Sequence, residues 1–280
     1  MTGLRILPFV LVAIFWTAPA TAKKPAPLRT DQIKISYVPP KDPMHAPIYA
    51  LLKERGALER FKVLFSPLRL KRPLLLKFEG CDGDANAWYD DDAITVCYEY
   101  LVDLIRGAPA QPTASGVTRI DAIIGPTLDT ILHEMGHALF HHHAIPVLGR
   151  EEDAADQFAA YIWLQVADKQ HVRRLLGGVA YAYDREASLP SSKKNPFADE
   201  HGLPAQRFFN VLCVAYGAHP DLFADLVASG TLPKERAEGC DAEYAQVKHA
   251  MERLIRPYFD VAMAKRVQAK GGLLRFDGPQ

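Results

Sequence analysis

The stretch TLDTILHEMGHALF, residues 127–140, predicts the central helix of this chain. Its apolar residues recur every three or four positions, which is the spacing of a helix that buries one face. His133 and His137 are four residues apart, so they lie on the same side of that helix, one turn from each other. Zinc binds imidazole nitrogen, and a catalytic zinc site combines three protein ligands with a position left for water. Glu134, beside the first histidine, has the chemistry of a general base for that water.

The same two histidines have a simpler interpretation. Cations are favoured near the C-terminal end of a helix, so His133 and His137 could serve only the helix dipole. A buried pair of imidazoles needs polar partners, however, and a bound metal ion supplies one for each ring. The apolar spacing around the pair therefore favours the metal site.

The third ligand is expected in GREEDAAD, residues 149–156. Glu151, Glu152 and Asp153 begin a predicted helix, and only one of these adjacent side chains can easily face the metal. Asp156 lies one turn after Glu152, on the same face. We therefore expect Glu152 to bind zinc and Asp156 to accept the other N–H of a ligand histidine. The remaining two acids then interact favourably with the dipole at the helix start.

His143 is an alternative third ligand. It follows His137 by six residues, which is the spacing of the third histidine in metzincin enzymes. That motif needs a glycine for its sharp turn, and this chain has Phe140 there. The histidines at 141–143 more simply cap the end of the helix, or bind metal adventitiously.

Composition limits the classes of protein that the chain can belong to. Its 280 residues suffice for one large domain, and 49% hydrophobic with 24% charged residues is ordinary for a globular protein. The formal net charge is zero, so we expect no nucleic-acid partner and no attraction to anionic membranes.

The first residues have the features of an export signal. A short basic start, an apolar run and the sequence ATA before Lys23 predict a signal peptide over residues 1–22, cleaved after Ala22. A retained anchor is the alternative. The Pro-, Lys- and Ala-rich residues 23–42 predict a flexible linker, and residues 43–280 a single domain. We expect a periplasmic or secreted protein that does not insert stably into a membrane after cleavage.

Four cysteines fit an oxidising compartment and allow three disulfide connectivities. The local pairs Cys81–Cys97 and Cys213–Cys240 are favoured because each encloses one predicted structural unit. Four free buried thiols are the alternative, and the cysteines lack the C-x-x-C spacing typical of a zinc site.

Hydrophobic patterning predicts an α+β fold with a small antiparallel sheet followed by a mostly helical half. Helices are expected over residues 44–65, 99–106, 121–142, 151–176, 206–216, 220–228 and 241–266. Strands are expected over 87–90 and 93–98, and residues 68–78, interrupted by Pro73, predict one or two more. The 121–142 helix has a possible break at Gly125-Pro126, and Gly177-Gly178 are expected to end the helix before them.

HEMGH followed by E-x-x-A-D resembles the gluzincin peptidases, which include thermolysin-like, neprilysin-like and CAAX-prenyl-type enzymes. The segment NAWY, residues 86–89, is similar to a gluzincin segment on the edge strand that flanks the active site. The resemblance implies a zincin-like fold, in which Asn86 and the Ala87 backbone bind the substrate main chain. An unpaired strand edge can accept an extended peptide. Trp88 and Tyr89 are more simply packing residues.

A second resemblance covers about residues 44–258. It rests on the segments CDGDANAWYD (81–90), ITVCYE (94–99), HEMGHA (133–138), GREEDAAD (149–156), DEH (199–201) and QRFFNVLC (206–213). These are similar to a family of bacterial secreted proteins whose metallopeptidase activity is inferred from their zinc motif. The likeness implies fold and compartment but no particular substrate.

The chain departs from well-known gluzincins in two ways. Only fourteen residues separate His137 from Glu152, fewer than in thermolysin-like enzymes. No familiar motif supplies a donor for the oxyanion of the transition state. His201, in Asp199-Glu200-His201, is our candidate for this catalytic role, and Arg207 is the alternative.

The sequence therefore predicts a zinc-dependent peptidase with one zinc ion per chain and a peptide or protein substrate. One alternative is a catalytically silent binding module that keeps the zinc. Another is a zinc amidase that acts on a non-protein, cell-wall peptide.

Overall fold

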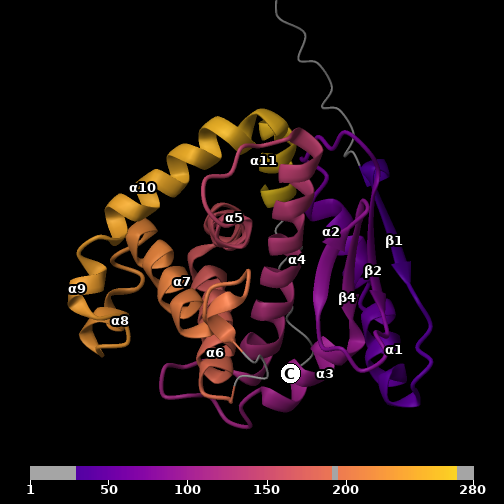
Figure 1. Ribbon diagram of the computed structural model, residues 1–280, viewed down its shortest axis with the longest axis horizontal. Coiled ribbons are helices and arrows are strands. Elements are labelled where there is room, and N and C mark those ends of the chain that lie inside the picture. The colour runs from indigo at the N-terminus through magenta and orange to yellow at the C-terminus, as the bar shows by residue number, and fades with distance from the viewer. Residues whose placement is uncertain (1–29, 191–194, 270–280) are drawn as a thin grey trace, which may run out of the picture.

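The computed structural model describes residues 30–190 and 195–269 (Figure 1). The expected signal peptide, its cleavage site and the first residues of the expected linker lie outside this part. Among the described residues, no helix is both long and apolar enough to cross a membrane.

Helix α4 (Arg119–His143) is the central element and carries both motif histidines. It begins with a capping box, in which Thr118 and Asp121 each accept the other's backbone N–H, and it ends at Ala144 in a left-handed conformation. The possible break at Gly125-Pro126 does not occur. A proline ring collides with the Cβ of the preceding residue in a helix, and Gly125 has none.

Glycines bring α4 and α6 (Lys169–Ala187) into close contact. A Cβ at Gly178 would collide with the backbone carbonyl of Asp121, and one at Gly125 with the carbonyl of Leu175. The prediction that Gly177-Gly178 end a helix was therefore wrong, because these residues lie inside α6 and allow the two backbones to approach.

The single helix expected over 151–176 is two helices, α5 (Glu151–Val166) and α6. They separate at Asp168, whose side chain accepts the backbone N–H of His171 and caps α6. The expected boundary was wrong because the apolar spacing runs on through this short break.

The sheet is mixed, with strand order β1-β2-β4-β3. The pairs β1–β2 and β2–β4 are parallel, and only β3–β4 is antiparallel. The strands are β1 (Ile33–Tyr37), β2 (Leu74–Glu79), β3 (Ala87–Asp90) and β4 (Ala93–Cys97). The expected antiparallel sheet was wrong because β1 and β2 are joined by a helical crossover, which makes their pairing parallel.

That crossover is α1 (Ala46–Glu54) and α2 (Ala57–Leu64), one expected helix divided at Gly56, which has a positive φ. Strand β1 occupies part of the chain expected to be a flexible linker. Its alternation of Ile33, Ile35 and Tyr37 was obscured by the Pro- and Lys-rich residues around it.

Helix α4 lies between the sheet and helices α5 and α6, whereas α1 and α2 lie on the sheet side, and β3 is at the edge of the sheet (Figure 1). Side chains from both sides of α4 belong to one hydrophobic core. The other helices are α3 (Tyr98–Gly107), α7 (Pro204–Ala218), α8 (Ala224–Ala228), α9 (Lys234–Ala237), α10 (Cys240–Ala250), a π-helical turn (Met251–Ile255) and α11 (Val261–Ala269). Short 3-10 turns occupy Thr30–Gln32, Pro43–His45, Pro196–Ala198 and Arg256–Tyr258.

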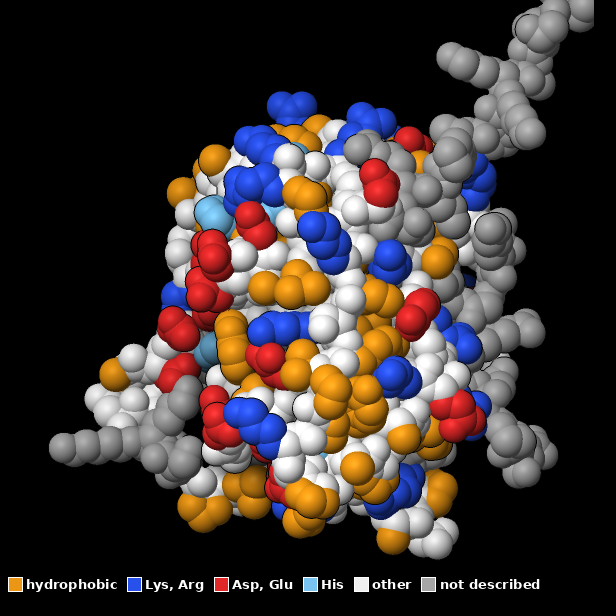
Figure 2. Space-filling model, turned by 90° about the vertical axis from the view of Figure 1, so that its right-hand side faces the viewer, with side chains coloured by type: hydrophobic (Ala, Val, Ile, Leu, Met, Phe, Trp, Pro, Cys, Tyr) orange, Lys and Arg blue, Asp and Glu red, His pale blue; other side chains and the backbone are white. Residues whose placement is uncertain are grey.

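Both expected disulfides are confirmed. Cys81–Cys97 links the loop before β3 to the end of β4, and Cys213–Cys240 links α7 to α10. On the face of the molecule that carries the sheet, basic and acidic side chains are interspersed and do not form a patch of one sign (Figure 2).

Candidate metal centre

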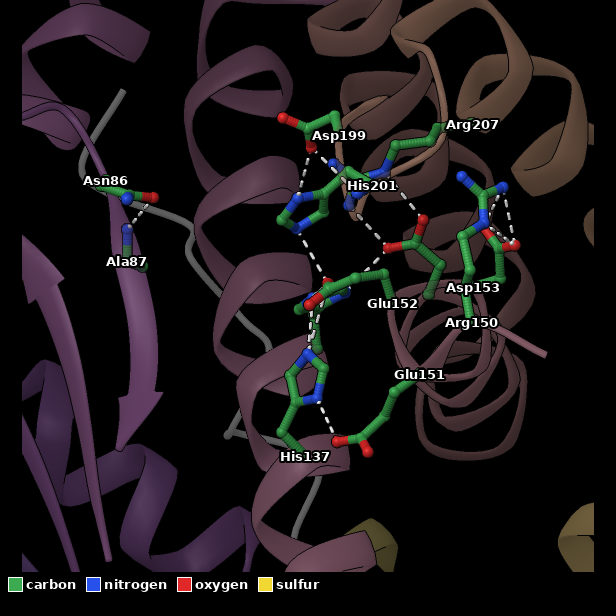
Figure 3. Close-up of polar contacts among 12 residues, drawn as sticks. Asn86, Ala87, His137, Arg150, Glu151, Glu152, Asp153, Asp199, His201 and Arg207 are labelled. Atoms are coloured by element: carbon green, nitrogen blue, oxygen red, sulfur yellow. Dashed lines mark hydrogen bonds and ion pairs between the residues drawn. The ribbon is translucent and has the colours of Figure 1, made fainter. Parts of the chain in front are cut away.

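Three of the predicted ligands converge on one point between α4 and α5 (Figure 3). The Nε2 atoms of His133 and His137 are 3.1 Å apart. The Oε2 atom of Glu152 lies 2.9 Å from Nε2 of His133 and 3.4 Å from Nε2 of His137. Ligands about 2.1 Å from a tetrahedral zinc ion are about 3.4 Å from one another, so this triangle has the size of three corners of a zinc site.

Local packing explains why α5 comes so close to α4. The backbone of Gly136 faces the first turns of α5, where an added Cβ would lie 3.2 Å from a ring carbon of Phe158 and 3.4 Å from the Cα of Ala155. A larger residue would hold the helices apart. The glycine inside the HEMGH motif thus lets Glu152 reach the two histidines.

Carboxylates hold the other nitrogen of each ligand histidine. Nδ1 of His133 lies 2.8 Å from Asp156, and Nδ1 of His137 lies 2.8 Å from Glu151. An ionised carboxylate only accepts hydrogen bonds, so each Nδ1 donates, and each Nε2 points at the shared centre. Sequence reasoning missed this contact of Glu151, which it treated only as an acid at a helix start.

Asp156 is itself held by Arg207 of α7. The guanidinium donates two hydrogen bonds to this carboxylate, at 2.8 and 2.7 Å, and stacks over the ring of Tyr183. Arg207 was the alternative candidate for an oxyanion donor. Its hydrogen bonds to Asp156 instead orient the carboxylate that holds His133.

The site is strongly polarised before any metal binds. Burial alone would lower the pKa of His133, but hydrogen bonds to Asp156 and Glu152 outweigh it and raise this pKa to about 10. Burial would likewise raise the pKa of Glu152, but hydrogen bonds from three histidines hold it far below its usual range. In the metal-free protein, the positive charge at this centre is therefore carried by protons on the histidine side chains. A divalent metal ion would displace these protons when it binds.

Glu134 is buried beside the ligands but makes no bond to either histidine ring among the residues described. Burial raises the pKa of its carboxyl group, while the neighbouring histidines and a hydrogen bond from the Tyr89 backbone oppose the rise. A raised pKa is what a base needs to take up a proton and release it again.

His201 faces the same centre from the loop before α7 (Figure 3). Its Nε2 lies 2.8 Å from Glu152, and its Nδ1 lies 3.3 Å from Asp199. Asp199 also accepts the backbone N–H of His201. The structure thus brings His201, which is distant in sequence, to the edge of the ligand triangle. In the sequence, the acidic residues beside it in Asp199-Glu200-His201 had indicated that it could belong to the site.

Asn86 and Ala87 lie on the other side of α4, at the start of the edge strand β3 (Figure 3). The carbonyl of Asn86 accepts a hydrogen bond from Cys97 of β4, so the next residue turns its backbone groups to the free edge. The side chain of Asn86 accepts the N–H of Ala87. The clamp expected from the resemblance is therefore on an exposed strand edge.

The three histidines that end α4 lie apart from this centre. His141 contacts the hydroxyl of Tyr89, and His142 pairs with Asp92. Nε2 of His143 bonds to the carbonyl of Arg69, and its ring stacks on Tyr258. His143 is therefore held away from the ligand triangle.

A helix that presents two imidazoles, with a carboxylate from the next helix, offers a set of donor atoms that suits a divalent metal ion. The chain belongs to the family described as "Putative metallopeptidase", which matches residues 37–255. No curated protein and no solved structure matches the chain. The family supports a metal-dependent hydrolase and leaves the ligands to be inferred from the geometry.

Proposed function

We propose that this protein is a zinc-dependent peptidase of the gluzincin type. The observation that carries the proposal is the shared direction of the ligand atoms. Carboxylates occupy Nδ1 of His133 and His137, so both Nε2 atoms and a Glu152 oxygen meet at one point. Two nitrogens and one oxygen are the ligand set of several catalytic zinc sites.

The residues around this point divide the chemistry between them. Zinc, when bound, polarises the scissile carbonyl and lowers the pKa of a water to about 7. Glu134 takes the proton of the attacking water and passes it to the leaving amine, for which its buried position and raised pKa are suited. Asp156 and Glu151 keep the ligand rings in position while this happens.

His201 is proposed as the donor to the oxyanion that forms on the substrate carbonyl. Its Nε2 is directed toward the ligand triangle, and Asp199 holds its backbone and its Nδ1. A donor fixed before the reaction stabilises the developing charge without reorganisation.

The substrate is proposed to lie along β3 as an added strand. Ala87 has its carbonyl at the free edge, and its N–H is held by the side chain of the exposed Asn86, which a bound peptide would displace. Backbone pairing of this kind binds an extended peptide with little dependence on side chains. The two disulfides are consistent with work outside the cytoplasm, in the periplasm or the medium.

The test compares wild type with Glu134→Gln after each is stripped by a chelator and reloaded with one equivalent of zinc. Both should hold one zinc, and wild type should cleave members of a peptide library, as read by mass spectrometry. The variant should be slower by about 10²- to 10⁴-fold, the usual contribution of a general base.

Two other results would redirect the proposal. If both zinc-loaded proteins left the library intact, a silent binding module would be favoured. If wild type cleaved only cell-wall peptide fragments offered alongside the library, the protein would be a zinc amidase.

A further inference from the structure

We propose a second divalent-cation site, formed by Glu152, Glu200 and His201. One ligand atom from each of these residues lies within 4.8 Å of the other two. Glu152 also belongs to the first triangle, so the inference rests on the proposed zinc centre. The contacts of His133, His137 and His201 all involve Oε2 of Glu152, and the second oxygen of this carboxylate would allow it to bridge two neighbouring cations.

His201 is oriented as metal-binding histidines are. Its Nδ1 faces the Asp199 carboxylate at 3.3 Å, and its Nε2 faces Glu152 at 2.8 Å. A carboxylate behind the ring, with the opposite nitrogen directed at the site, is the usual arrangement around a ligand imidazole.

Glu200 supplies the second carboxylate. Its side chain is exposed, and it forms no ion pair within the described part of the chain. A cation could therefore bind it without breaking an existing salt bridge.

The local charge also favours a second ion. Acidic side chains at the centre outnumber the one buried arginine that compensates them, Arg207. These acids are Glu151, Glu152, Asp156, Asp199 and Glu200. A single divalent ion leaves an excess of negative charge, and a second ion would reduce their mutual repulsion.

The proposed second site competes with catalysis. A ligand needs the lone pair of Nε2, whereas an oxyanion donor needs a proton there, so His201 cannot do both at once. The second ion would also draw electron density from Glu152. Because this site is more exposed and richer in oxygen than the first, zinc should bind it more weakly and act as an inhibitor at excess.

Isothermal titration of zinc into the chelator-stripped protein tests the inference. Wild type should show two binding events, one tight and one weaker. Glu200→Gln should keep the tight event, and its affinity for the second zinc ion should fall by more than about 100-fold. Residues that only hold a ligand in place contribute roughly 10- to 100-fold to metal affinity, so the loss of a ligand should cost more. Glu54→Gln, which makes the same charge change at an exposed position on α1, should behave as wild type.

Peptide cleavage at rising zinc provides the second measurement. Excess zinc should inhibit wild type and Glu54→Gln, and should leave Glu200→Gln unaffected. Two events retained in Glu200→Gln, or a single event in wild type, would overturn the second site and leave the proposed peptidase intact. A wild type that binds no zinc would instead overturn the first site.

Discussion

The backbone amide of Tyr89, on β3, lies near the carboxyl group of Glu134, on α4, and lowers the pKa that burial raises. The proposed general base thus lies beside the strand proposed to bind the substrate. The side chain of Tyr89 forms a second link between the same two elements, because its hydroxyl lies 2.7 Å from Nδ1 of His141 and 3.3 Å from Asp92. The position of the base and that of the strand edge are therefore coupled.

Removing the hydroxyl of Tyr89 should loosen this coupling. Tyr89→Phe should lower kcat/KM for peptide cleavage by about 2- to 10-fold, since one hydrogen bond contributes roughly 0.5–1.5 kcal/mol. Zinc content should not change, because no ligand is touched. Trp88→Phe is the control, as Trp88 lies on the opposite face of β3. A loss of zinc in Tyr89→Phe, or an equal loss of activity in the control, would refute the link.

Asp156 should matter for both metal binding and folding. Asp156→Asn removes the charged acceptor of His133 and leaves the buried guanidinium of Arg207 without its partner. Zinc affinity should fall by about 10- to 100-fold, and the free energy of unfolding by roughly 3–5 kcal/mol. These changes are measured by competition with a chromophoric chelator and by urea unfolding.

Asp153→Asn is the matched control for that variant. Asp153 pairs with Arg150 in a partly exposed salt bridge, for which the expected loss is at most about 1 kcal/mol. Equal losses in the two variants would show that the buried network has no special role.

Asp129 should destabilise the fold at neutral and higher pH. Burial, and to a smaller extent the charge of Asp156, raises the pKa of this carboxyl group to about 7. Among the described residues, its only hydrogen-bond donor is the indole N–H of Trp163. A native pKa above the unfolded value means that the contribution of Asp129 to stability is most favourable below about pH 4 and declines until about pH 7. The shift corresponds to about 4 kcal/mol at most.

Asp129→Asn stays neutral and should escape this decline. It should be more stable than wild type at pH 8 and similar to it at pH 4, as measured by urea unfolding at both pH values. The exposed Asp184→Asn should show no such difference. A variant that is less stable than wild type at pH 8 would show that the native carboxyl is ionised without cost.

Zinc removal should have an effect that grows with pH. In the metal-free protein, the pKa of His133 is raised to about 10, so the stability it contributes is present below its unfolded value of about 6.5 and lost as pH rises toward 10. Zinc affinity increases over the same range because fewer protons compete for the ligands. The difference in Tm between zinc-loaded and stripped protein should therefore widen from pH 6.5 to 9.5 in thermal scans. A difference that is constant or narrows would contradict the assignment of His133.

The sequence predicted local relationships well. His133 and His137 are one helical turn apart, so their spacing alone predicted that they lie side by side. Each disulfide closes a short segment, so the spacing of the cysteines also favoured the observed pairs. Glu152 was also placed with its histidines, because a resemblance and a one-turn relation to Asp156 pointed to the same helix face.

Relationships set by packing escaped the sequence. The contact of Glu151 with His137 depends on how far α5 approaches α4, which is controlled by Gly136. Gly178 is a residue type that often ends a helix, but here it lies inside α6 and contacts α4. Only the three-dimensional structure shows this, because there a Cβ at Gly178 would collide with the backbone of Asp121. Strand β1 is short and its pairing is non-local, so its polar neighbours dominated the local pattern.

Anomalous scattering at the zinc edge, from crystals of protein loaded with one equivalent of zinc, tests the central claim most directly. We expect one peak about 2.0–2.2 Å from Nε2 of His133, Nε2 of His137 and an oxygen of Glu152, with the fourth position left for water. A peak among the histidines at 141–143, or a fourth position closed by His201, would contradict a catalytic zinc centre here.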